Sequence, residues 1–117
     1  MPTPQDIVRA YCALWNENDA DVRAQLLDLC WDDDGSNQIG ERTVAGRRAV
    51  AADIERFRAR CPNDKAVLTS DIAFAGRWFR FSAEVRRLDG SVYSRMLDVG
   101  ELAPDGRIVW IVTFPAE

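Results

Sequence analysis

The fold is decided by the stretch RWFRFSAEVRRLDGSVYSRMLDVGELAPDGRIVWIVTF, which spans residues 77–114. Apolar and polar residues alternate along much of it, which is the period of a β-strand with one buried face. Asp89-Gly90 and Pro104-Asp105-Gly106 divide the stretch at sequences that favour tight turns. It therefore predicts three consecutive antiparallel strands, one around 79–85, one over 92–102 and one over 107–114.

The alternation also predicts which side chains of these strands face the core. In the first strand the inward residues are Phe79, Phe81, Ala83 and Val85. An earlier strand follows Lys65, and its shared face carries Leu68, Ser70, Ile72 and Phe74.

Three helices are expected before residue 65. Thr3 caps the first, which starts at Pro4, Asp19 caps the second, and the third follows Gly46 and stops at Pro62. Their apolar stripes are Ile7, Val8, Tyr11, Leu14 and Trp15, then Val22, Leu26, Leu29 and Cys30, then Val50, Ile54, Phe57 and Cys61.

The segment between the second and third helices is weakly patterned. Asp32-Asp33-Asp34-Gly35 predicts a turn, and residues 36–42 predict a short strand or an extended loop. Helices first and strands after predict one α+β domain over residues 1–117, with the helices on one face of an antiparallel sheet.

The composition excludes several kinds of site. The chain has 117 residues, a net charge of −4 and 47% hydrophobic residues, which suits one compact domain. It contains no histidine, so Ser-His-Asp catalysis, Cys-His catalysis and histidine metal sites are excluded. Cys12, Cys30 and Cys61 form no ligand cluster and are expected to be reduced packing residues. We expect neither a metal nor a cofactor.

The charge pattern and the N-terminus bear on partners and location. The net charge is negative and the charges are interspersed, which disfavours nucleic acid as a partner. Residues 1–6 show no signal-peptide pattern, and the longest uncharged stretch, Ile108–Ala116, is too short to span a bilayer as a helix. The sequence therefore predicts a cytoplasmic protein that binds neither nucleic acid nor membranes.

Five short stretches carry a resemblance to a known family: Leu26–Trp31 with the acidic turn after it, Gly46–Val50, Leu68–Ser70, Leu97–Leu102 and Pro104–Ile108. Together they resemble SnoaL-like members of the NTF2-like superfamily over nearly the whole chain. The resemblance implies a cystatin-like cone, in which three N-terminal helices pack on a curved antiparallel sheet with a small-molecule pocket at the open end. The superfamily holds isomerases, polyketide cyclases, dehydratases and transport adaptors, so the resemblance alone assigns no activity.

Two polar residues on apolar faces are the candidate catalytic residues. Tyr11 lies on the core stripe of the first helix, and Asp98 shares a strand face with Val92, Met96 and Leu102. Lost hydration raises the pKa of such a carboxyl, so a neutral Asp98 and the Tyr11 hydroxyl would both donate hydrogen bonds to an oxyanion. By resemblance, both positions match the oxyanion-hole Tyr and Asp of ketosteroid isomerase.

The resemblance also implies a general base that this sequence lacks. The base Asp of that isomerase falls at Gln38, or at Ile39 if the register moves by one, and neither accepts a proton at neutral pH. Asp71, on the opposite strand face from the core residues, and Asp34 and Glu41, beside the lost base, are weak substitutes.

Other residues are expected to surround the ligand or to form an interface. The expected lining of the pocket, around a small apolar or aromatic ligand, is Trp15, Trp31, Gln38, Phe57 and Met96. The expected exposed apolar patch, which predicts a homodimer through the sheet, is Trp78, Tyr93, Leu97 and Val99.

Structural alternatives stay open at this point. Tyr11 and the tryptophans are also typical of core packing residues. Asp98 could equally accept structural hydrogen bonds from backbone amides or pair with an arginine. Three functions therefore remain: an isomerase- or cyclase-type enzyme acting on a polycyclic or enolisable molecule, a non-catalytic binding protein, and a dimeric interaction module with a filled cone.

Overall fold

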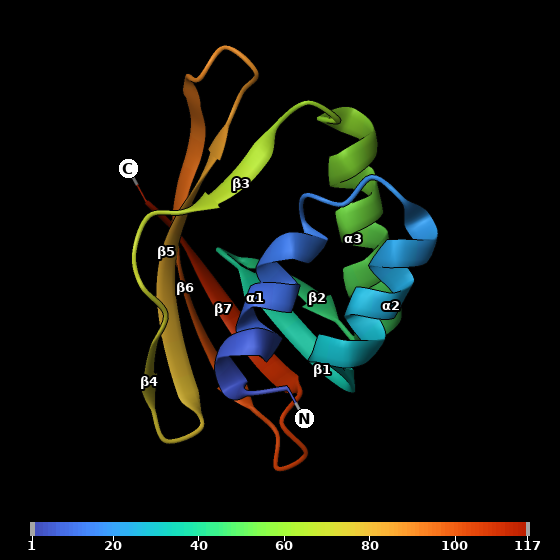
Figure 1. Ribbon diagram of the computed structural model, residues 1–117, viewed down its shortest axis with the longest axis vertical. Coiled ribbons are helices and arrows are strands. Elements are labelled where there is room, and N and C mark those ends of the chain that lie inside the picture. Colours follow the sequence, from blue (N-terminus) through green and yellow to red (C-terminus); the bar gives the residue numbers. More distant parts are fainter. Residues whose placement is uncertain (1, 117) are drawn as a thin grey trace.

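A computed structural model describes residues 2–116, and Figure 1 shows three helices against one face of a strongly curved sheet. The helices are α1 Pro4–Leu14, α2 Ala20–Cys30 and α3 Arg47–Arg60. The strands are β1 Trp31–Ile39, β2 Arg42–Ala45, β3 Lys65–Leu68, β4 Ala73–Ala75, β5 Trp78–Arg86, β6 Val92–Leu102 and β7 Ile108–Ala116. The expected α+β cone is confirmed. No helix within the described range is long and apolar enough to cross a membrane.

All the strands belong to one sheet, in the order β2-β1-β7-β6-β5-β3. β3 pairs with the last part of β5, and β4 pairs with its first part. The other neighbours are antiparallel as expected, but β1 and β7 run parallel. This parallel pair joins the first strand of the chain to the last, so that β1 contributes side chains to the same concave face as β5, β6 and β7.

The helix starts follow the capping residues of the sequence. The Thr3 hydroxyl accepts a hydrogen bond from the Asp6 backbone N–H, and the Asp6 carboxylate accepts one from the Thr3 N–H. Asp19 accepts two backbone hydrogen bonds from the first turn of α2. Both caps therefore satisfy N–H groups that have no partner inside the helix.

The buried face of α2 differs from the expected stripe. Leu27 and Cys30 are buried, whereas Leu29 is 42% exposed and points to solvent. Strand β1 starts directly after Cys30, and the fully buried Trp31 follows. Because Cys30 and Trp31 both enter the core, the face of α2 that carries Leu27 and Cys30 packs inward and Leu29 lies on the outer face.

The acidic run Asp32-Asp33-Asp34-Gly35 lies in strand β1 and does not form the expected turn. The Trp31 indole Nε1 donates to the Gly35 carbonyl at 2.8 Å. The register of β1 against β7 shifts between Trp31 and Ser36, so the chain bulges here while it stays extended. A Cβ at position 35 would overlap the Trp31 indole, so this close approach requires glycine.

The strand expected over 65–74 is interrupted, and forms β3 and β4. The Ser70 hydroxyl accepts the Ser82 backbone N–H at 2.7 Å and so replaces a strand carbonyl. Residues 70–72 leave the sheet at this point, while the Ile72 side chain stays buried. Strand β2, which follows a turn at Gly40-Glu41, was not expected as a separate strand.

A buried arginine fixes the ends of α1 and α3, and the sequence pattern did not reveal it. Arg58 is only 4% exposed. Its guanidinium donates to the Asn18 Oδ1 atom at 2.9 Å and to the carbonyls of Trp15, Pro62 and Asp64 at 3.0, 2.7 and 2.9 Å. One side chain thus joins the segment after α1 to the loop that enters β3.

We expect Arg58→Met to lower the free energy of unfolding by about 2–3 kcal/mol, because methionine fills the space but leaves these acceptors without a donor. Urea unfolding measures the loss. Arg56→Met is the matched control, since Arg56 is an exposed residue of the same helix that pairs with Asp53. Equal losses in both variants would contradict a special role for Arg58.

Candidate functional site

A cavity of about 130 Å³ lies between the helices and the concave face of the sheet. Its apolar lining consists of Trp15, Ile39, Phe57, Ala66, Val67, Leu68, Phe81, Ala83, Val85 and Met96. Its polar lining consists of Tyr11, Cys12, Asn37, Asp98 and Thr113. The wall is therefore largely hydrophobic, with polar groups from α1, β1, β6 and β7.

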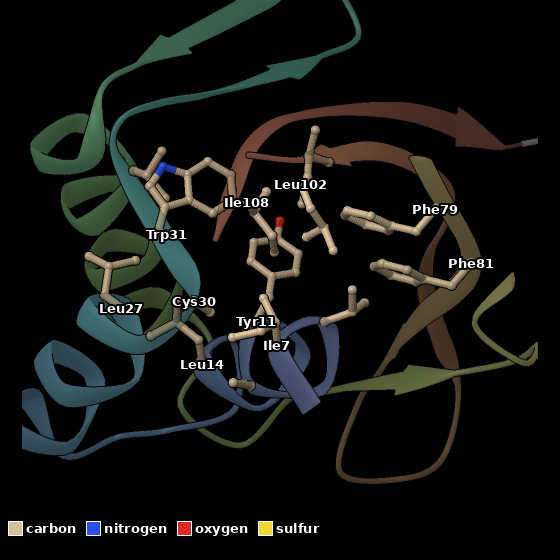
Figure 2. Close-up of a cluster of buried hydrophobic side chains, with 14 of the residues drawn as sticks. Ile7, Tyr11, Leu14, Leu27, Cys30, Trp31, Phe79, Phe81, Leu102 and Ile108 are labelled. Carbon is tan, nitrogen blue, oxygen red and sulfur yellow. The ribbon is translucent and has the colours of Figure 1, made fainter. Parts of the chain in front are cut away.

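Tyr11 forms the wall between the cavity and the filled part of the core. Its ring stacks on Trp31 with centroids 5.5 Å apart, and it meets Trp15 edge-on at 6.4 Å. Figure 2 shows the side chain pointing from α1 toward the sheet, among the buried core residues. Burial, and then the nearby Asp98 carboxyl, raise the pKa of Tyr11 well above its usual value, so its hydroxyl keeps its proton.

Asp98 is the acidic group of the cavity wall. It is 5% exposed, and its Oδ1 atom is buried without a hydrogen-bond partner. Burial raises the pKa of Asp98 to about 6, and the neighbouring Thr113 hydroxyl opposes part of that rise. The direction of this shift is the one expected from the sequence, and a carboxyl with such a pKa accepts hydrogen bonds when ionised and donates one when protonated.

Two polar residues of the wall were missed by the sequence reasoning. Thr113 pairs with Asp98 across β6 and β7, and its Oγ1 atom lies 3.3 Å from Asn37 Oδ1. Asn37 is 2% exposed and reaches the cavity from β1. Only the long-range pairing of β1 with β7 brings these residues together, and no local pattern indicates it.

The expected ligand residues divide into two groups. Trp15, Phe57 and Met96 line the cavity, and the rings of Trp15 and Phe57 meet edge-on at 5.6 Å. Trp31 does not line it, because its fully buried indole packs behind Tyr11. Gln38 does not line it either, because it alternates with Asn37 and Ile39, the residues of β1 that line the cavity.

Gln38 lies on the opposite face of β1, beside the turn that leads into β2. Its Nε2 atom donates to the Gly40 carbonyl at 2.8 Å, and its Oε1 atom accepts from the Thr43 hydroxyl at 2.5 Å. The substitute bases Asp34, Glu41 and Asp71 are exposed and lie outside the cavity wall. Among the lining residues that the structure describes, Asp98 is therefore the one carboxylate.

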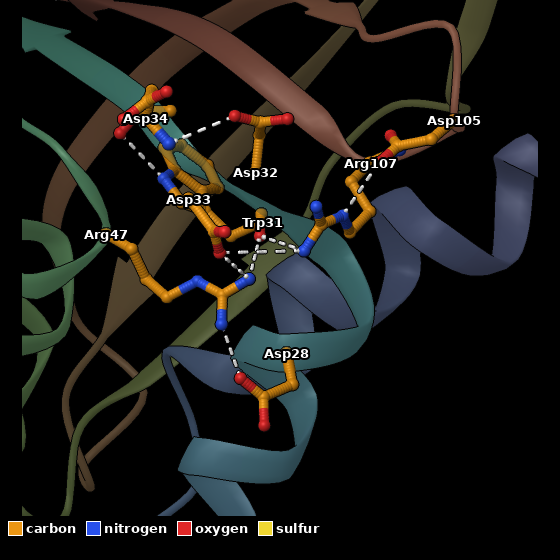
Figure 3. Close-up of polar contacts among 9 residues, drawn as sticks. Asp28, Trp31, Asp32, Asp33, Asp34, Arg47, Asp105 and Arg107 are labelled. Atoms are coloured by element: carbon orange, nitrogen blue, oxygen red, sulfur yellow. Dashed lines mark hydrogen bonds and ion pairs between the residues drawn. The ribbon is translucent and has the colours of Figure 1, made fainter.

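A cluster of charged side chains surrounds the start of β1, near Trp31, and its contacts join α2, β1 and α3 (Figure 3). Arg47 pairs with Asp28 and with Asp33, and donates to the Trp31 carbonyl at 2.7 Å. Arg107 also approaches Asp33, at 3.8 Å. The acidic run is thus partly neutralised by arginines. Within residues 2–116, no group of three or more His, Cys, Asp or Glu side chains is placed to hold a metal ion.

Ionisation of the buried Asp98 lowers stability as the pH rises. The unfolded chain releases this proton near the ordinary pKa of 3.8 and the folded protein near 6, so stability falls between these values. We expect Asp98→Asn to be more stable than the wild type at pH 8, by up to about 3 kcal/mol, with little difference at pH 4. Urea unfolding at the two pH values measures this, with the exposed Asp71→Asn as control. A constant difference would contradict the shift.

Comparison with solved structures identifies the relatives of this chain. A SnoaL-like family protein from Agrobacterium tumefaciens, provisionally assigned as an isomerase, is 30% identical over 95% of both chains, with a TM-score of 0.87. An NTF2-like protein of unknown function from an Exiguobacterium species is 19% identical over 95% of this chain and 98% of that chain, with a TM-score of 0.74. A provisional polyketide cyclase from Sinorhizobium meliloti is 19% identical over 93% and 94%, with a TM-score of 0.73.

The last two relatives are similar in fold alone. No protein-family model matches the sequence, and no curated protein matches it. The Agrobacterium protein matches in sequence as well as in fold, over nearly the full length of both chains. This chain therefore belongs to the SnoaL-like family.

Proposed function

We propose that this protein is an isomerase- or cyclase-type enzyme that moves a proton on a small apolar or aromatic molecule and stabilises the resulting oxyanion through Tyr11 and Asp98. The observation that carries the proposal is the buried Asp98 carboxyl, which faces an apolar cavity with one oxygen unpartnered. Buried polar atoms are nearly always hydrogen-bonded, so an unpartnered one in a cavity wall suits a ligand.

Asp98 is the group that exchanges the proton. Its ionised carboxylate takes a proton from a carbon beside the carbonyl group of the ligand, and the C–H electron pair moves onto the carbonyl oxygen. Where a C=C bond is conjugated with this enolate, the electron pair on oxygen re-forms the carbonyl group, the double bonds shift, and a different carbon takes the proton back from Asp98, which completes an isomerisation. The raised pKa, about 6, suits a base that must both take and return a proton near neutral pH.

Tyr11 is the donor to the oxyanion. Its raised pKa keeps its hydroxyl protonated, and a hydrogen bond given in an apolar cavity is worth more than one given in water. Once Asp98 carries the proton, it becomes a second donor. This scheme assigns the base role to Asp98, in place of the position that Gln38 occupies.

The alternative is a non-catalytic binding protein with the same cavity. It is favoured by the small set of titratable groups in the wall, where Tyr11 and Cys12 accompany Asp98 and both hold their protons. In that case Asp98 only accepts a hydrogen bond from the ligand, and no proton leaves carbon.

Exchange of carbon-bound hydrogen for deuterium tests the proposal. We expect the protein to accelerate deuterium uptake from D2O into single-ring ketones such as 3-cyclohexenone, followed by NMR. The rate should rise with pH, reach half of its maximum near pH 6 and level off above about pH 7, because the carboxylate is the active form.

Variants assign the roles in that experiment. Asp98→Asn should abolish the acceleration, Tyr11→Phe should lower it by about 10²-fold, and the exposed Asp71→Asn should leave it unchanged. Ligand binding without any deuterium uptake would favour the binding-protein alternative.

We also propose a homodimer through the convex face of the sheet. All three helices lie on the concave side (Figure 1), which leaves this face without a covering layer. Trp78 and Phe114 are 48% and 51% exposed there. Strand pairing places Leu97 beside Phe114, and Val99 beside Val112, so the apolar residues are contiguous.

We expect Phe114→Glu to convert the dimer to a monomer, because two buried carboxylates would face each other across a two-fold interface. Sedimentation velocity at micromolar concentration measures the change. Leu88→Glu is the control, since Leu88 is 82% exposed at the β5–β6 turn, away from this face. A monomeric wild-type protein would refute the dimer.

A further inference from the structure

The charges around Asp98 are unbalanced. Among residues 2–116, no Arg or Lys side chain lines the cavity, and the other polar groups of its wall are Tyr11, Cys12, Asn37 and Thr113. Burial raises the pKa of the Cys12 thiol to about 12, and that of Tyr11 rises too, so both are neutral at physiological pH. When Asp98 is ionised, the cavity therefore carries one negative charge with no counter-ion in its wall.

The uncompensated negative charge determines which ligands bind unfavourably in the cavity. A carboxylate or phosphate would meet a like charge in an apolar surrounding, where repulsion is poorly screened. An O–H group would instead donate a hydrogen bond to the Asp98 carboxylate, which lines the cavity and has one oxygen without a partner. The charge thus discriminates against anions and in favour of hydrogen-bond donors.

The size of the cavity limits the part of the ligand that reaches Asp98. Its volume is about 130 Å³. An apolar cavity on the order of 150 Å³ holds one benzene molecule. The rings of Trp15 and Phe57, together with Met96, form walls suited to a flat group of this size.

We propose that the cavity takes an uncharged single-ring group bearing an O–H donor, which it presents to Asp98, and that it excludes carboxylates. The inference goes beyond the proposed function, because it concerns which ligands the same site selects and holds whether or not a proton leaves carbon. It also assigns Asp98 the role of acceptor in the ligand complex, where the resemblance to ketosteroid isomerase implies a donor.

Three ligands of one ring size test the proposal by NMR titration or calorimetry: phenol, its methyl ether anisole, and benzoate. At pH 7 we expect phenol to bind at least about tenfold more tightly than anisole, because only phenol donates to the carboxylate. Benzoate should bind more weakly than either. Its affinity should rise about tenfold between pH 7 and pH 5, since Asp98 is the lining group that gains a proton in this range.

Variants separate the charge of Asp98 from its shape. Asp98→Asn should admit benzoate at pH 7 and remove the pH dependence of its binding. The exposed Asp71→Asn should behave as the wild type does. The wild-type pH titration carries the same test without any substitution, so it still applies if Asp98→Asn does not fold.

Several outcomes would overturn the inference: benzoate binding at pH 7 as tightly as phenol, anisole matching phenol, a benzoate affinity that ignores pH, or no binding of any of the three. These measurements need no turnover. Selective binding of phenol without deuterium exchange would refute the proposed enzymatic function and support this inference. Deuterium exchange together with tight benzoate binding would support the enzymatic function and refute this inference.

Discussion

The stacking of Tyr11 on Trp31 organises the interior of the cone. A curved sheet with helices on its concave side must fill that side, and the indole of Trp31, with Ile108 and Leu102, fills one end completely. Tyr11 packs on this end with one face of its ring, and it also lines the cavity. The site therefore begins where the core packing stops, and Trp31 supports it without touching a ligand.

The local patterns of the sequence were sufficient for most elements. Alternation set the inward side chains of β5, and the capping residues Thr3 and Asp19 set the helix starts. The predictions failed where a side chain replaced a backbone hydrogen-bond partner, or where a charged residue was buried. Ser70 interrupts a strand by accepting a ladder hydrogen bond, and Arg58 is buried because carbonyls from two segments surround it.

The candidate site could be predicted only in part, for a related reason. Tyr11 and Asp98 stand out because each is a polar residue on an apolar stripe. Asn37 and Thr113 lie 76 residues apart, and their contact depends on the parallel pairing of β1 and β7. Gln38 lies between Asn37 and Ile39, which both line the cavity, so its side chain faces the other side of the sheet. A shift of one residue in the assumed correspondence is enough to exchange Gln38 for either neighbour.

The parallel pairing of β1 with β7 has a consequence for the order in which the molecule can form. During synthesis, the hairpin of β1 and β2 emerges early, but its second neighbour is the last strand of the chain. Until β7 arrives, one row of backbone N–H and C=O groups on β1 has no partner, and closing so long a loop is slow. The nascent chain therefore exposes a strand edge open to pairing with other chains, and the last strand both completes the sheet and removes that hazard.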